Sequence, residues 1–225
     1  MTGNDTWAEE HKGVIGASEA GHCARAIGYR LLGYEPLPFS PTTLAIFERG
    51  HALEPVIADI KRREGYWVER YKQLPYTSWY NNEEDRIWLV ANPDYYCYKD
   101  GEDYNLQVKA VNPYHGKSLV KNAQAGRLVE ETPQYYWQVQ AEMAAIKEHF
   151  MLHTITKTIL CVCDVATMKT TDIVIPFDEE IWNVHRQKLE QIWYNATIDG
   201  ELAPREYAEK EWQCSYCNYK QHCYS

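Results

Sequence analysis

Hydrophobic residues recur along the chain at two different spacings, one typical of helices and one typical of strands. Apolar residues spaced three and four apart are typical of amphipathic helices. Ser18 and Gly33 are residue types that suit the beginning and end of the first of these helices. We expect Pro55 to kink the second helix or to divide it in two. The predicted helices cover residues 18–32, 43–64, 133–147 and 178–196.

A period of two residues predicts the strands, which are rich in aromatic and β-branched residues. The predicted strands cover residues 67–71, 87–90, 94–98, 104–111, 149–156 and 171–176, and the segment 159–165 is not assigned. The order of elements predicts an α/β fold of the mixed α+β kind, with a central mixed sheet of about four to six strands flanked by helices. A length of 225 residues suits one domain, 1–225.

Composition and charge narrow the class of protein. The chain has 18 Tyr and 8 Trp but only 4 Phe, and such amphipathic rings suit base stacking as well as cores whose polar tips reach water. A net charge of −9 argues against a surface covered in positive charge, but it leaves room for a local basic track. The chain has no apolar run long enough for a bilayer, and the polar segment 1–12 lacks the apolar stretch of a signal peptide. We therefore expect a cytoplasmic protein.

The most informative segment is 91–110. Asp100-Gly101 between two extended runs predicts a two-residue hairpin turn. With these two residues as the loop, stepping back along both strands brings Asp94 opposite Gln107. Because side chains alternate along a strand, Lys109 then shares a face with Gln107. The turn thus predicts an acid, an amide oxygen and a lysine close together.

This pattern resembles the PD-(D/E)XK nuclease superfamily, with Pro93-Asp94 as the first element and Gln107-Val108-Lys109 as the second. The resemblance implies a hydrolase that holds Mg²⁺ or Mn²⁺ on oxygen ligands and uses the lysine to orient the attacking water. It implies a metal set that includes Asp94, Gln107 and Val108. Gln107 departs from the usual Glu or Asp. It is either a native variant, a degenerate site that does not cut, or a deliberate Glu→Gln change.

Two further segments resemble RecB-like and YqaJ-like nucleases. The spacing Gly50-x-x-x-Glu54 is similar to their upstream helix motif, which implies Glu54, in preference to His51, as a further metal ligand. The segment PQYYWQVQAEM, 133–143, is similar to the helix after the catalytic strands, and it implies a site role for Gln138 with help from Tyr135. For Gln140 and Tyr136 we expect a core or surface role.

The cysteines form a second pattern, Cys214-x2-Cys217-x5-Cys223, with Cys23 near the other end of the chain. Four thiolates suit a 4Fe–4S cluster or structural zinc, and in a zinc version His22 or His222 could substitute for one of them. The order of these cysteines around a nuclease core, 43–176, resembles AddB-type and CRISPR-associated adaptation exonucleases, and this implies the 4Fe–4S cluster. We name the predicted unit of 15–33 and 205–225 the iron–sulfur clasp.

The remaining cysteines have a different expected role. Cys97, Cys161 and Cys163 fall in or near predicted extended segments. Free cysteine is among the most buried residue types, so we expect these three to be core residues rather than ligands.

Together these resemblances imply a metal-dependent exonuclease that acts on single-stranded DNA or duplex ends in recombination, repair or replication, with a viral recombination enzyme among the types resembled. Phosphate contacts are expected from Lys117, Lys121 and Arg127. A homo-oligomer or a recombination partner protein fits the same resemblance. Two alternatives stay open, a DNA-binding or assembly subunit weakened by Gln107 and an iron–sulfur redox or sensor protein.

Overall fold

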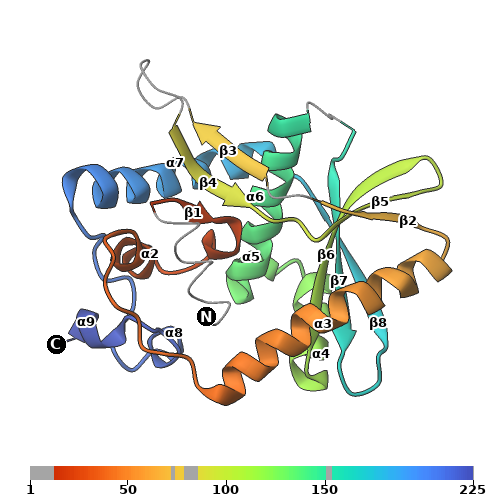
Figure 1. Cartoon of the computed structure of the whole chain (residues 1–225), viewed down its shortest axis with the longest axis horizontal. Helices are drawn as coiled ribbons and strands as arrows, with labels where there is room; N and C mark the ends of the chain where they lie inside the picture. Colours follow the sequence, from red (N-terminus) through yellow and green to blue (C-terminus); the bar gives the residue numbers. More distant parts are fainter. Residues whose placement is uncertain (1–12, 72–73, 79–85, 151–153, 225) are drawn as a thin grey trace.

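The computed structural model describes residues 13–71, 74–78, 86–150 and 154–224 (Figure 1). Its central sheet has five strands in the order β2-β5-β6-β7-β8. Only β6 and β7 are parallel and the other neighbours are antiparallel, so the sheet is mixed, as predicted. The strands are β2 (Trp67–Arg70), β5 (Tyr95–Lys99), β6 (Glu102–Val111), β7 (Lys157–Asp164) and β8 (Thr170–Pro176).

The predicted hairpin register is confirmed for every pair of residues within β5 and β6, whereas the predicted pair Asp94–Gln107 lies just beyond the paired residues. Lys99 lies opposite Glu102 and Tyr95 lies opposite Leu106. Asp100 and Gly101 have φ angles of 53° and 88°. Positive φ at both loop residues is the backbone requirement of a two-residue type I′ turn, which explains why this pair of residues fixed the register.

A second, three-stranded sheet has the order β1-β4-β3, with β1 parallel and β3 antiparallel to β4. Its strands are β1 (Ile15–Gly16), β4 (Arg86–Ala91) and β3 (Leu74–Ser78), and β3 was not predicted. The sequence therefore builds two sheets where the periodicity indicated one.

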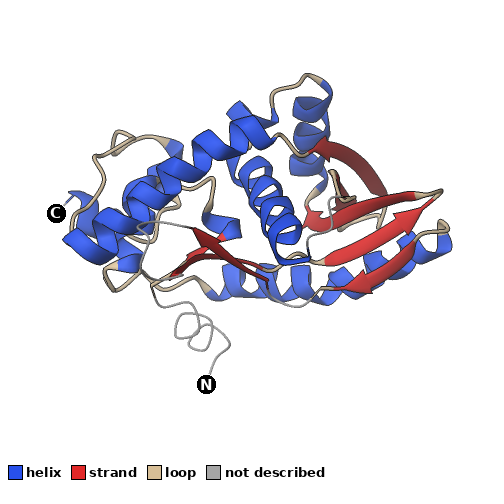
Figure 2. Ribbon diagram, turned by 90° about the horizontal axis from the view of Figure 1, so that it is seen from above, coloured by secondary structure: helices blue, strands red, loops and turns tan. Residues whose placement is uncertain are grey.

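The helices cover both faces of the central sheet (Figure 2). They are α2 (Ala24–Leu31), α3 (Pro41–Arg63), α4 (Pro113–Gln124), α5 (Leu128–Glu131), α6 (Pro133–Phe150), α7 (Glu179–Tyr194), α8 (Trp212–Ser215) and α9 (Lys220–Tyr224), with a 3₁₀ turn η1 (Ala17–Glu19) and a π-helical turn η2 (Asn195–Asp199). In the described part of the chain, no helix has the length and apolar character needed to cross a membrane.

Three expectations for these elements were wrong. The first helix begins at Ala24 rather than at Ser18, because η1 and a turn precede it. Pro55 does not divide α3, which runs through it as one helix, so that half of the expectation is wrong. The strand predicted at 149–156 is not formed where it is described, since α6 continues to Phe150 and the strand is β7, in the unassigned segment.

The core lies in layers on either side of the central sheet. On one face, α3 places Ile57 and Ala58 against Leu106 and Val108 of β6. On the other, α4, α5 and α6 pack against β7 and β8. Cys97, Cys161 and Cys163 are buried in the α3 face, as expected for core cysteines.

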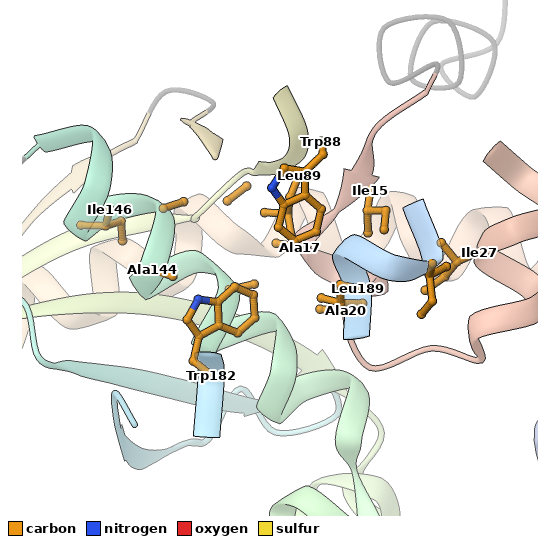
Figure 3. Close-up of a cluster of buried hydrophobic side chains, with 14 of the residues drawn as sticks. Ile15, Ala17, Ala20, Ile27, Trp88, Leu89, Ala144, Ile146, Trp182 and Leu189 are labelled. Atoms are coloured by element: carbon orange, nitrogen blue, oxygen red, sulfur yellow. The ribbon is translucent and has the colours of Figure 1, made fainter. Parts of the chain in front are cut away.

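A further cluster joins the second sheet to η1, α2, α6 and α7 (Figure 3). Trp88 of β4 and Trp182 of α7 are each 1% exposed, and they pack with Ile15 and Ile146. Helix α6 contacts β7 of the central sheet, β3 and β4 of the second sheet and the turn η1, so it joins the two sheets (Figure 1).

Candidate active site

Asp94 lies directly before β5 and binds the backbone of the next strand. One of its oxygens, Oδ2, accepts a hydrogen bond of 2.7 Å from the N–H of Val108. Burial raises the pKa of this carboxyl to about 6, against the opposing effects of the Lys109 charge and of that N–H bond. The carboxyl group is therefore held at the middle of β6, where the predicted Gln107-Val108-Lys109 element lies.

Lys109 is held by a helix on the same face. Its Nζ donates a hydrogen bond of 2.9 Å to Oε1 of Gln138 on α6. It also lies 5.2 Å from the centre of the Tyr135 ring, whose hydroxyl is 3.4 Å from Nε2 of His115. The structure thus brings the predicted lysine, glutamine and tyrosine together, and it adds His115, at the start of α4, which sequence reasoning missed.

A fully buried acid, Glu142, continues this network. Nε2 of Gln138 donates to Glu142 Oε1 at 2.8 Å, and Nδ2 of Asn105 on β6 donates to Oε2 at 3.0 Å. Burial, together with the nearby charge of Asp94, raises the pKa of the Glu142 carboxyl to about 8. Neither Glu142 nor Asn105 was predicted. The available signal was an acid four residues after Gln138, which places both on one helix face.

Gln107 is 3% exposed, and its Oε1 has no hydrogen-bond partner in the described structure. Asn105 Oδ1, two residues earlier on the same strand face, is likewise buried without a partner. A buried amide oxygen that bonds to nothing carries the full cost of losing its water. Both oxygens lie on the face of β6 that Asn105 turns toward α6.

Glu54 reaches this region from α3. Its side chain is 14% exposed and pairs with the exposed Arg70 at 3.2 Å, and its charge raises the pKa of Asp94. His51, one turn earlier on the helix, is exposed. The carboxylates of Glu54 and Asp94 and the unpartnered Gln107 oxygen are hard ligands that fit a divalent cation.

Among the described residues, no three His, Cys, Asp or Glu side chains converge closely enough to hold one metal ion. Two further oxygen donors, the side-chain amides of Gln107 and Asn105, are not His, Cys, Asp or Glu and so are not counted in that statement. A divalent cation here would therefore use an amide oxygen as well as carboxylates.

Residues named for other roles are distributed as follows. Lys117 and Lys121 are exposed on α4, while Arg127 bonds Asn122 and pairs with Glu131. Gln140 is fully buried and bonds the backbone of Pro176 and Asp178, which confirms a core role. Tyr136 packs against the same core.

The four candidate ligand cysteines line one pocket. Cys23 directly precedes α2, Cys214 lies in α8, Cys217 follows it and Cys223 lies in α9. Figure 1 shows α2 beside α8 and α9, and the Tyr29 hydroxyl donates to the carbonyl of His222 at 2.8 Å. The fold thus brings together thiols from both ends of the chain, which fits a Cys₄ cluster.

The geometry does not favour zinc held by a histidine. His22 and His222 are not among the residues that line this pocket. Nε2 of His222 instead donates to the carbonyl of Glu35 at 2.8 Å. No three of the described thiols and imidazoles lie close enough to hold one ion.

Three solved structures share this fold. They are an alkaline exonuclease, LHK-Exo, from Laribacter hongkongensis (16% identity, TM-score 0.58, 87% of this chain and 93% of that chain) and LHK-Exo in complex with dAMP (17%, 0.61, 87% and 93%). The third is SSO0001 (16%, 0.52, 97% of this chain and 92% of that chain). No family model and no curated protein matches the chain. The chain therefore shares its mixed sheet and flanking helices with these structures, a similarity of the fold alone.

Proposed function

We propose that the protein is a metal-dependent exonuclease that hydrolyses phosphodiester bonds at DNA ends. One observation carries this proposal. In a fold shared with an alkaline exonuclease, the Asp94 carboxyl accepts a bond from the N–H of Val108, and the residues on either side of Val108 carry the unpartnered Gln107 oxygen and the Lys109 ammonium. An acid, an amide oxygen and a lysine so placed are the groups that cation-assisted phosphate hydrolysis needs.

Each residue has a distinct role in this proposal. Asp94, Glu54 and Gln107 would hold Mg²⁺ or Mn²⁺. Val108, the remaining member of the predicted metal set, would hold the Asp94 carboxyl in place through its backbone N–H. When bound, the cation would polarise the scissile phosphate and acidify a water. Lys109 would hold that water in line with the phosphorus, and Gln138 would keep the Lys109 ammonium in place.

A structural neighbour and this surface support DNA as the substrate class. LHK-Exo is named as an alkaline exonuclease and has been solved in complex with dAMP. In this chain the exposed Lys117 and Lys121 on α4 would contact the DNA backbone near Lys109. The same proposal takes single-stranded DNA or duplex ends as the substrate and recombination, repair or replication as the process. It also includes a cytoplasmic location and a homo-oligomer or a partner protein.

The iron–sulfur clasp is the second part of the proposal. Cys23, Cys214, Cys217 and Cys223 would hold a 4Fe–4S cluster whose role is structural, because hydrolysis transfers no electron. The support is the shared pocket and the bonds between 15–33 and 205–224, such as Ala24 N–H to Glu206 Oε2 at 2.9 Å. Anaerobically purified protein should then carry iron and sulfide and absorb visible light. Stoichiometric zinc without iron would contradict the cluster.

The activity is tested with end-labelled single-stranded and duplex DNA in the presence of Mn²⁺. Asp94→Asn and Lys109→Ala should each lower the cleavage rate at least about a hundredfold, the usual contribution of such groups. Lys99→Ala is the matched control, since that lysine lies on the same hairpin but bonds the backbone of Glu64. Wild-type protein that releases no nucleotide, or Lys109→Ala that cuts as fast as wild type, would sink the proposal.

One observation favours a second candidate function. Gln107 supplies no charge where an acid is usual, so the chain could be a DNA-binding or assembly subunit that does not cut. Gln107→Glu separates the two readings. Silent wild-type protein that gains Mn²⁺ binding and cleavage through this one change would favour the subunit.

A further inference from the structure

The buried acid Glu142 has no role in the site as predicted from sequence. It is 0% exposed and lies on the face of α6 that contacts β6. Its two oxygens accept hydrogen bonds from the side-chain amides of Gln138 and Asn105, and no described Lys, Arg or His forms an ion pair with it. A buried carboxyl that meets only neutral donors is costly to ionise, and a bound cation would offset that cost.

The surroundings of Glu142 are rich in oxygen and poor in positive charge. Asp94 is close enough to raise the pKa of Glu142, and Lys109 is the described cation whose charge opposes this. The same face of β6 carries the two unpartnered oxygens, Asn105 Oδ1 and Gln107 Oε1. Two carboxyl groups and two unpartnered amide oxygens are the ligand types that a divalent cation takes.

Glu142 is also tied to the predicted catalytic lysine. Gln138 bonds Lys109 through Oε1 and Glu142 through Nε2, so the three side chains form one continuous chain. Gln138 and Glu142 further line a pocket of about 120 Å³ that extends to Ser18 and to Asn92, two residues before Asp94. Asp94, Asn105 and Gln107 are not among its lining residues, so the pocket belongs to the Glu142 end of this network.

We propose that Glu142 supplies a carboxylate to the divalent-metal site from the α6 side, opposite Asp94, replacing the acid that position 107 lacks. This inference rests on the proposed nuclease function. Gln107 then contributes a neutral oxygen from β6, and the negative charge comes from α6 across the same interface. The total charge of the site is then unchanged, although the carboxylate comes from helix α6 instead of strand β6.

The test measures Mn²⁺ binding directly, by calorimetry and by the Mn²⁺-induced rise in melting temperature. Glu142→Gln should weaken Mn²⁺ affinity at least about tenfold, and the double variant Gln107→Glu/Glu142→Gln should restore it to within about threefold. Glu190→Gln is the matched control, because Glu190 is a buried acid, 6% exposed, that pairs with Arg186 away from the site. A purely structural Glu142 would alter the melting temperature without altering its response to Mn²⁺.

The outcomes separate this inference from the function on which it rests. Wild type that binds no Mn²⁺ and cuts no DNA refutes both. Wild type that binds and cuts, with Glu142→Gln equal to Glu190→Gln, refutes the role of Glu142 alone. If Glu142→Gln does not fold, the Mn²⁺ affinity of the single variant Gln107→Glu tests the role of Glu142 instead. A gain in affinity below about threefold is expected because the acid is already present, and a tenfold gain would overturn the inference.

Discussion

Gly21 offers a sharp test of how the N-terminal turn is placed against α6. A Cβ at this position would lie 2.4 Å from the carbonyl oxygen of Pro133 and 2.5 Å from Cα of Gln134. These are backbone atoms at the start of α6, so no side-chain rotation relieves the contact. The segment that carries Gly21 would have to move by about 1 Å to reach ordinary van der Waals distance.

The cost follows from this overlap. Overpacking of a well-packed contact destabilises a protein by about 1–3 kcal/mol. For a chain of this size, each kcal/mol lowers the melting temperature by about 2–4 °C, so Gly21→Ala should melt about 2–12 °C lower. The same shift would move Cys23 and loosen the start of the helix that carries Gln138, so we also expect lower exonuclease activity and lower iron content.

The matched control is Gly50→Ala in the middle of α3, where an added Cβ meets nothing within 4 Å. There alanine should stabilise the helix by about 0.5–1 kcal/mol, because glycine has the larger conformational entropy to lose. Both variants are compared with wild type by urea unfolding followed by circular dichroism. Gly21→Ala as stable as wild type, or a shift of the same sign in both variants, would refute the packing of the N-terminal turn on α6.

Two further predictions concern parts of the fold outside the active site. Burial lowers the pKa of His185 to about 4, so this ring favours the neutral form in the folded protein. The neutral ring contributes on the order of 3 kcal/mol to the free energy of unfolding above pH 6.5, and this contribution is lost as the pH falls toward 4. In His185→Gln the urea midpoint of unfolding should therefore change less with pH over that range. A pH dependence equal to that of the wild type would contradict this. If the proposed cluster is bound, Cys223→Ala should abolish bound iron and speed proteolysis of the C-terminal tail. Cys97→Ala, a change at a buried core cysteine, should leave the iron content unchanged. Equal iron content in the two variants would contradict the proposed cluster.

The hairpin could be predicted because its information is local. Asp100 and Gly101 are adjacent, their backbone angles select one turn, and the turn sets every pairing between β5 and β6. Placing Gln107 and Lys109 on one face then needed only the alternation of side chains along a strand. The same reasoning failed at β7. That strand lies between β6 and β8 with both faces buried, so its residues form one apolar run without alternation.

Glu142 could not be predicted for the opposite reason, since nothing local marks it. In α6 it stands among buried residues such as Ala141 and Met143, so no polar stripe of the helix distinguishes a functional acid from a surface one. Its meaning depends on Asn105, which is brought to it only when α6 packs across β6. A neutral residue at 107 and a buried acid at 142 look like two separate irregularities in the sequence. In the folded chain they face the same oxygen-rich space, and each explains why the other is tolerated. Substitutions at the two positions should therefore not be additive, because residues that share one site are energetically coupled.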